Sequence, residues 1–302
     1  MKLLMENWRK FLNEENEPSV NMPQLLDTEY TKFVQYLGAN IQDPKTRALI
    51  GAGLAASDGD PSDDVFGFQE GPIAVAKLIP TQNEIDINKS LAYPLVKDPS
   101  EFVSKASSNG PFTVVEPIVT FNGRYVIDGH HRWSAVYACN KNASIDAINI
   151  TMEGIDALDA LKAVQMAIGL QAKKVPMQSV EGTNLLKIDQ NALTGWITKN
   201  VPNATYEAIV ADPQVKKLIT NYAKTQEVTE ITSMGLALVR TGLINYIWSN
   251  VASMRKTSQP VKGAGPRDFM PQTGGVKWKE PLAKGQVDIK PPHGNLAKKA
   301  AE

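Results

Sequence analysis

The densest group of chemically capable side chains in this 302-residue chain is the run Asp128–Arg132, whose sequence is Asp-Gly-His-His-Arg. An imidazole can give or take a proton near neutral pH, and a guanidinium binds phosphate or carboxylate oxygens through paired hydrogen bonds. Only one other histidine, His293, exists in the chain. The two adjacent histidines therefore mark the first place to look for acid–base chemistry or for the binding of a phosphate.

The residues around this run predict a strand, a sharp turn and a helix. Arg124–Ile127 has the aromatic and β-branched composition of a strand, Gly129 lies in the turn, and Trp133–Cys139 can continue as a helix. A helix N-terminus attracts anions, and glycine lets the backbone approach a ligand closely. We therefore predict that residues 128–132 bind phosphate. The alternative is a solvated surface turn in which both histidines and Arg132 face water.

A second polar segment precedes this turn. Ile73–Pro80 has the apolar positions of a strand that ends at a proline, and Gln82, Glu84 and Asp86 follow it. A carboxylate placed beside a phosphate can orient or deprotonate the group that attacks it. This segment therefore supplies the acidic residues that phosphate chemistry at the histidine turn would need.

Other segments predict the elements that position these residues. Phe112–Phe121 and Ile145–Ile150 have strand composition, and Asn122-Gly123 is a hairpin turn signal. Helices are predicted after the last strand by apolar residues at helical spacing, over 155–170, 193–200, 205–210, 214–224 and 230–254. The combination is typical of an α+β protein.

The two polar segments together resemble the nucleotide-binding boxes of the ParB/sulfiredoxin superfamily. There the turn is Gly-Glu-Arg-Arg in partition ParB proteins and Gly-Gly-Cys-His-Arg in sulfiredoxins. In the free-serine kinases of the superfamily it is Asp-Gly-His-His-Arg, as in residues 128–132 here. The resemblance covers about residues 71–170 and implies a small mixed sheet with helices. It also implies a bound nucleotide, ATP or ADP or CTP, with Mg²⁺.

Two departures narrow the activity that the resemblance implies. The nucleophilic cysteine of sulfiredoxins would fall at His130, and the lone Cys139 lies further along the helix, where we expect a packed apolar residue. The partition-protein pattern has arginine at the position of His131, and no obvious helix-turn-helix follows. Sulfinic-acid reduction and CTP-gated DNA clamping are therefore not expected.

The reaction that we expect is phosphoryl transfer or nucleotide hydrolysis. Arg132 and the backbone after Gly129 would hold phosphate, His130 or His131 would donate to a phosphate oxygen, and Glu84 or Asp86 would position or deprotonate the acceptor. The full set of predicted nucleotide-binding residues is Gln82, Asp128, Gly129, His130, His131 and Arg132. No metal site built by the protein alone is predicted, because the histidines lack companions at ligand spacing.

Two other classes of function stay open. A ParB-like nuclease or DNA-binding protein would use the same residues on a nucleic-acid phosphate. The C-terminal residues 255–302, with 10 basic and 4 acidic side chains, favour it, whereas residues 1–70 carry 12 acidic and 6 basic ones. A phage virion or internal head protein with a vestigial nucleotide site is the third class. The apolar stripe of residues 1–17, ending near Leu12-Asn13-Glu14, resembles a cleavable capsid-targeting leader. The alternative for this stripe is a terminal helix packed on the domain or on another subunit.

Composition bounds the remaining possibilities. With 42% hydrophobic and 21% charged residues and a formal net charge of zero, the chain reads as a soluble globular protein, in the cytoplasm of a host cell or within a phage particle. One cysteine excludes a disulfide framework. Ile231–Trp248 contains Arg240 at its middle, so a buried helix with core or homo-oligomer contacts is expected there, and no membrane partner.

These patterns divide the chain into five segments. In order they are an amphipathic leader helix (1–17), N-terminal helices with an acidic linker (18–70), the ParB/sulfiredoxin-like domain (71–175), a helical subdomain (176–255) and a basic Gly/Pro-rich tail (256–302). The tail is predicted to lack regular structure because its apolar periodicity stops.

Overall fold

The computed structural model describes residues 67–151, 156–158, 160–161, 182–223 and 235–265. The predicted leader, the N-terminal helices, the acidic linker and most of the predicted tail lie outside these residues, as does most of the helix predicted over 155–170. Glu70–Ile148 and Val180–Val261 belong to one compact unit, which contains almost all of the described elements.

The protein belongs to the α+β class, as predicted. A mixed sheet of five strands has the order β1-β5-β3-β4-β2. The strands are β1 (Gly67–Ala74), β2 (Ile79–Pro80), β3 (Ile118–Phe121), β4 (Tyr125–Asp128) and β5 (Ser144–Thr151). The α-helices are α5 (Ile87–Ala92), α6 (Pro99–Ser107), α7 (His130–Cys139), α9 (Gln190–Asn200), α10 (Asn203–Ala211), α11 (Pro213–Ala223) and α12 (Gly235–Thr257), joined by the short helical turns η2 (Val75–Lys77) and η3 (Tyr93–Lys97).

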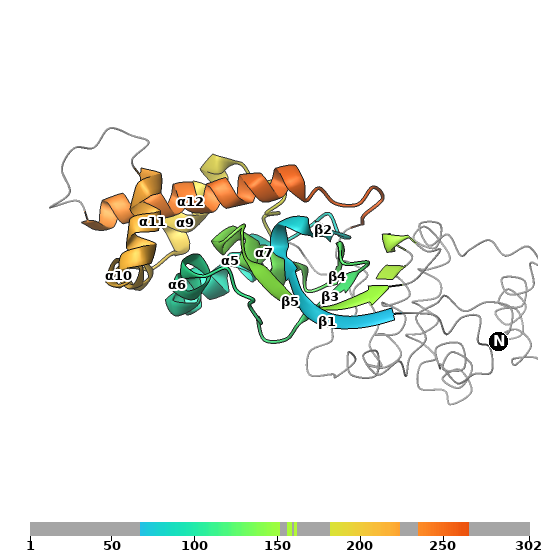
Figure 1. Ribbon diagram of the computed structural model, residues 1–302. Helices are drawn as coiled ribbons and strands as arrows, with labels where there is room; N and C mark the ends of the chain where they lie inside the picture. Colours follow the sequence, from blue (N-terminus) through green and yellow to red (C-terminus); the bar gives the residue numbers. More distant parts are fainter. Residues whose placement is uncertain (1–66, 152–155, 159, 162–181, 224–234, 266–302) are drawn as a thin grey trace, which may run out of the picture. The chain divides into compact units, whose positions relative to one another are not determined.

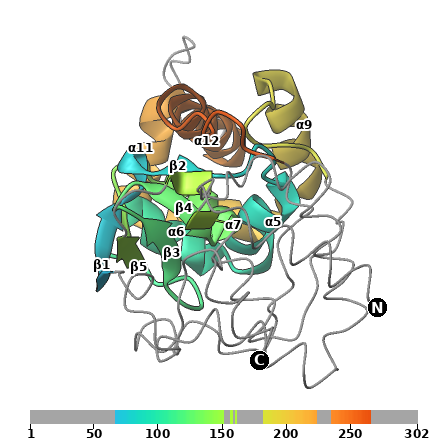
Figure 2. The ribbon, with the colours of Figure 1, turned by 90° about the vertical axis from the view of Figure 1, so that its right-hand side faces the viewer.

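The hairpin between β3 and β4 confirms the predicted turn. Asn122 and Gly123 both have positive φ, 50° and 62°, which is the conformation that a two-residue turn between twisted strands requires. β3 and β4 are antiparallel, whereas β4 pairs in parallel with β2 on its other side. The turned view in Figure 2 shows β2 and β4 side by side. Strand β4, which leads into the histidine turn, therefore lies between β3, its neighbour in sequence, and β2, which is distant in sequence.

The predicted strand over Ile73–Pro80 is divided in two. The turn η2 separates β1 from β2, and Leu78 N donates to Val75 O across it at 3.2 Å. Val75 N donates to Ala143 O at 2.9 Å, and Trp133 Nε1 donates to Val75 O at 2.9 Å. The backbone at Val75 thus makes its hydrogen bonds outside a strand ladder. The bend falls at Lys77, where a charged residue interrupts the alternation of apolar positions expected of a strand.

The strand predicted over Phe112–Phe121 is correct only in its second half, which forms β3. Val115 has φ of 68°, a left-handed conformation that a β-branched residue avoids in a strand. Phe112 pairs with Ile145 through an isolated parallel bridge. Residues 112–117 are therefore an irregular connection that leads into the start of β3.

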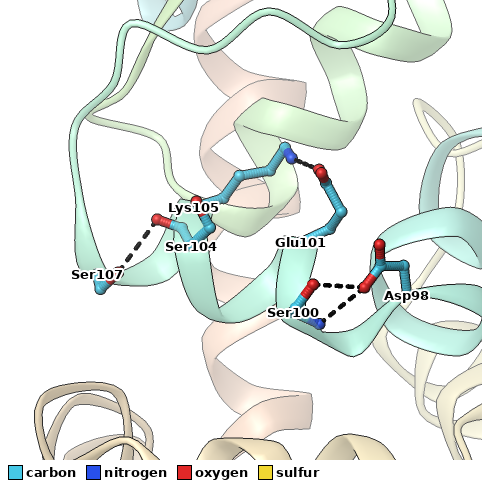
Figure 3. A network of polar contacts seen from close by, with 6 residues as sticks. All are labelled: Asp98, Ser100, Glu101, Ser104, Lys105 and Ser107. Atoms are coloured by element: carbon cyan, nitrogen blue, oxygen red, sulfur yellow. Dashed lines mark hydrogen bonds and ion pairs between the residues drawn. The ribbon is translucent and has the colours of Figure 1, made fainter.

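Residues 87–107 form helices that the apolar pattern did not predict. Their starts have clear caps, because Asp86 Oδ1 accepts from Asn88 N and Asp98 Oδ1 accepts from Ser100 N. Figure 3 shows the cap at Asp98 and, one turn further along α6, an ion pair between Glu101 and Lys105. The aspartate caps are the local signal from which these helices could have been predicted.

The long helix α12 connects the C-terminal helices α9, α10 and α11 to α7, the helix that follows the motif strand β4. This helix contacts α7 as well as α9, α10 and α11 (Figure 1), and its residues Leu243, Ile247, Val251 and Met254 are buried. Asn250 Nδ2 and Tyr246 Oη donate to backbone carbonyls of α7. The four buried residues were predicted as core or oligomer contacts together with Leu238, which is half-buried, and Met234, which lies outside the described residues. In the part of the chain that the structure covers, no helix has both the length and the apolar composition needed to cross a membrane.

Gly242 allows α11 and α12 to approach closely. A Cβ atom built at Gly242 would lie 2.3 Å from the carbonyl oxygen of Ile219, which is backbone and cannot swing away. We expect Gly242→Ala to lower the free energy of unfolding by about 1–3 kcal/mol, the usual range for overpacking. Gly195→Ala on α9 is the control, because nothing lies within 4 Å of its Cβ position. It should instead stabilise by about 0.5–1 kcal/mol. Urea denaturation measures both, and equal effects would contradict the close approach.

Candidate functional site

The predicted site lies at one edge of the sheet, where two parallel strands end. β2 continues into the loop Thr81–Asp86 and then α5, while β4 continues through Gly129 into α7. Because β2 and β4 are parallel neighbours, both loops leave the sheet at the same edge. Ligands of α/β proteins commonly bind at such an edge, beyond the carboxyl ends of the strands.

Gly129 forms the start of α7 and has no tolerance for a side chain. Its φ is 94°, and a Cβ atom there would lie 2.6 Å from Ile118 Cγ2 and 3.0 Å from a guanidinium nitrogen of Arg132. No side chain caps the helix, whose first backbone bond runs from Trp133 N to Gly129 O at 2.9 Å. Because glycine has no side chain, no carboxylate or hydroxyl at the N-cap position offsets the partial positive charge at the N-terminus of α7.

Arg132 is held by both neighbouring loops and is mostly buried. Its guanidinium donates to Asp128 Oδ2 at 2.8 Å, to the carbonyl of Glu116 at 2.6 Å and to the carbonyl of Pro117 at 3.1 Å. The Glu116 carboxylate lies 3.4 Å from the same group. Arg132 therefore joins the irregular connection before β3 to the end of β4, and its position is fixed before any ligand binds.

The two histidines join α7 to the loop after β2. His130 Nε2 accepts from Thr81 N at 3.2 Å, and His131 Nε2 accepts from Asp86 N at 3.1 Å. A backbone N–H can only donate, so each Nε2 carries a lone pair and each ring is bonded in its neutral form. In this arrangement neither Nε2 can donate to a phosphate oxygen, the role predicted for one of them. We call these two hydrogen bonds the histidine latch.

The alternative of a solvated histidine pair does not hold for His130. Only 4% of its surface is exposed, and Thr81, whose backbone N–H it accepts, is fully buried. His131 is half-buried. His130 is thus part of the packed interior, and His131 lies partly at the surface.

The structure distinguishes the two carboxylates that sequence alone left equivalent. Asp86 is 6% exposed, and its oxygens accept from Asn88 N at 2.6 Å and from Gly182 N at 3.2 Å, so it caps α5 and binds a distant segment. Glu84 is half-buried, and its carboxylate makes no hydrogen bond or ion pair with the residues that the structure covers. Glu84 is therefore the carboxylate with acceptor capacity left for a ligand.

Gln82 shapes the loop instead of pointing an amide outward. It is 5% exposed, and its Nε2 donates to Glu84 O at 2.6 Å. Its neighbour Thr81, which the sequence did not single out, is fully buried and donates from Oγ1 to Val126 O at 2.6 Å. The threonine thus binds the loop to β4 beside the latch.

A second set of residues missed by sequence reasoning comes from far along the chain. Asn184 hydrogen-bonds the backbone on both sides of Glu84, and Gly182 binds Asp86. A side chain added at Gly182 would lie 2.8 Å from Asp86 Oδ2. No local sequence signal links these residues to the loop, because the link is a backbone bridge between Asp86 and Asn184.

Cys139 is a packed apolar residue, as predicted. It is fully buried, and this burial raises the pKa of its thiol to about 12, although the nearby Lys105 opposes the rise. Lys105 is itself buried, paired with Glu101 and placed 5.4 Å from the centre of the Phe112 ring. The Cys139 thiol is therefore held in its protonated form inside the core.

The described residues contain no group of three histidine, cysteine or acidic side chains able to hold a metal ion. Comparison of the chain with protein-family models, with curated proteins and with solved structures gave no match.

The raised pKa of Cys139 predicts a thiol that is unreactive in the folded protein. At pH 8 a thiol with a pKa of about 12 is ionised to roughly one part in 10⁴. We expect a chromogenic disulfide reagent to modify Cys139 only as fast as the protein unfolds, and at once in urea. Since the chain has one cysteine, the signal needs no control for other thiols. Rapid labelling of the native protein would contradict the burial.

The two carboxylates should differ in their effect on stability. Asp86→Ala removes the cap of α5 and the bond to Gly182, so we expect a loss of about 1–2 kcal/mol in the free energy of unfolding. Glu84→Ala removes no hydrogen bond or ion pair with the described residues and should change stability by less than about 0.5 kcal/mol. Urea denaturation of both variants measures this difference, and a larger loss for Glu84→Ala would show the assignment to be wrong.

Proposed function

We propose that the protein binds the phosphates of a nucleotide at the N-terminus of α7 and catalyses phosphoryl transfer or nucleotide hydrolysis there. The observation that carries this proposal is the histidine latch, which places the loop bearing Glu84 beside the turn at Gly129. A phosphate-binding turn and an available carboxylate are the two parts that such a reaction needs from a protein.

The turn supports phosphate binding through its backbone. The dipole of α7 favours a negative group at its N-terminus, where no side chain caps the helix. Arg132 adds a positive charge. Its contact with the Glu116 carboxylate, at 3.4 Å, is longer than its hydrogen bonds and is the one most easily exchanged for a phosphate oxygen.

The charges around the turn support a nucleotide that arrives with Mg²⁺. Glu116 and Asp128 lie against the guanidinium of Arg132, and the loop that the histidine latch binds to α7 adds Glu84 and Asp86, while the histidines accept hydrogen bonds as neutral rings. A polyphosphate alone would meet repulsion from these carboxylates, and a bound magnesium ion offsets its charge. Glu84 then serves as the group that orients or deprotonates the acceptor, whether a water molecule or a hydroxyl.

A screen of nucleotides tests the proposal. We expect ATP, ADP, CTP or GTP, each with Mg²⁺, to raise the melting temperature of the wild-type protein, and at least one triphosphate to be turned over. Arg132→Ala should weaken the affinity by about 2 kcal/mol, the value of a charge-assisted hydrogen bond. Glu84→Gln should keep the affinity and lower kcat by about 10²-fold.

Two controls separate these effects from general changes of charge. Arg124→Ala removes an arginine that lies next to Tyr125 at the opposite end of β4, and Glu207→Gln neutralises a carboxylate on α10. Both should bind and turn over nucleotide like the wild type. If no nucleotide shifts the melting temperature, or if Arg132→Ala binds as well as Arg124→Ala, the proposed site is wrong.

A further inference from the structure

We infer that Asn184 is a positioning residue for Glu84, an inference that rests on the proposed function. Its side-chain amide holds the backbone on both sides of the glutamate. Nδ2 donates to the carbonyl of Asn83 at 2.8 Å, and Oδ1 accepts from Ile85 N at 3.1 Å. The residues before and after Glu84 are therefore fixed by one side chain from a segment distant in sequence.

The segment around Asn184 extends this support along the loop. Leu185 N donates to Ile85 O at 2.7 Å and Ile87 N donates to Thr183 O at 3.0 Å, on either side of the isolated antiparallel bridge between Asp86 and Asn184. Ile85 and Leu185 are fully buried, which anchors the pairing in the core. Glu84 is the half-buried residue that this pairing leaves at the site edge.

The chemistry of the position requires an amide. Asn184 donates with one atom and accepts with the other, and Oδ1 also accepts from Leu186 N at 3.0 Å, which fixes the orientation of its own side chain. Aspartate would keep both acceptor contacts and lose the donor to Asn83 O, and alanine would lose all three contacts. The aspartate variant therefore removes the support before Glu84 and leaves the support after it.

The opposite side of the loop is held independently by the histidine latch on α7. A variant at Asn184 thus leaves Thr81 and Asp86 bound, so the loop should stay in place while the peptide groups next to Glu84 gain freedom. Since the Glu84 carboxylate makes no hydrogen bond or ion pair with the described residues, its position depends on its own side-chain torsions and on the backbone that carries it. A misplaced base lowers the rate of the chemical step more than it lowers binding.

A double-mutant cycle tests this inference on the full-length protein. Asn184→Asp and Asn184→Ala are each made alone and in the Glu84→Gln background, and kcat and KM are measured for the triphosphate that the wild type turns over. We expect each single variant at Asn184 to lower kcat by about 10-fold or more with KM changed by less than about 3-fold. In the Glu84→Gln background the same changes should have no further effect on kcat.

Two more measurements make the outcome specific. Hydrogen exchange at Ile85 N should accelerate in Asn184→Ala and stay slow in Asn184→Asp, which keeps the acceptor. Asn200→Ala, which removes an amide that binds Trp196 O within α9, is the matched control and should keep the wild-type kcat. If Asn184→Ala fails to fold, the isosteric Asn184→Asp still provides the cycle.

The results separate the inference from the proposed function. A wild-type protein that neither binds nor turns over nucleotide defeats the proposed function and this role of Asn184 with it. An active wild type whose kcat is unchanged by both Asn184 variants overturns the positioning role alone. Equal losses in the wild-type and Glu84→Gln backgrounds also overturn it, because Asn184 would then act on the fold and not through Glu84.

Discussion

The histidine latch is the interaction on which the arrangement of the candidate site depends, at the edge of the sheet where β2 and β4 end. Two imidazole nitrogens of α7 accept the backbone N–H groups of Thr81 and Asp86, so the loop after β2 is bound at both of its ends. Buried backbone donors must find acceptors, and this loop has no strand beside it to supply them all. The adjacent histidines at the start of α7 thus replace the hydrogen bonds that a longer β2 would have made with a neighbour.

This use of histidine ties the site to the charge state of the rings. A protonated ring would place a donor against a donor at each bond, and His130 has almost no access to water that could relieve the conflict. The arrangement therefore exists with neutral histidines. Arg132 then remains the one cation among the described groups of the turn. Its position is fully determined because Asp128 and two backbone carbonyls hold its guanidinium.

Local patterns predicted those parts of the fold that local interactions stabilise. The hairpin turn at Asn122-Gly123, the strand and helix of the motif and the core face of α12 were predicted because their signals lie within a few residues. The break at η2 and the irregular connection around Val115 were not, because backbone bonds to distant residues such as Ala143 determine them. The site shows both cases, because Asp86 is distinguished from Glu84 by a local cap on Asn88 and also by a contact from the distant Gly182.

The division of labour between these carboxylates has a physical basis. A base needs lone pairs that the fold has not used, together with a backbone that cannot drift. Asp86 meets the second requirement and fails the first, because a helix cap and a loop contact occupy its oxygens. Glu84 meets the first through its side chain and the second through the bonds on either side of it. The other polar groups of the loop are used to hold it in place. The Glu84 carboxylate keeps its acceptor capacity, at the edge of the sheet where the two parallel strands end.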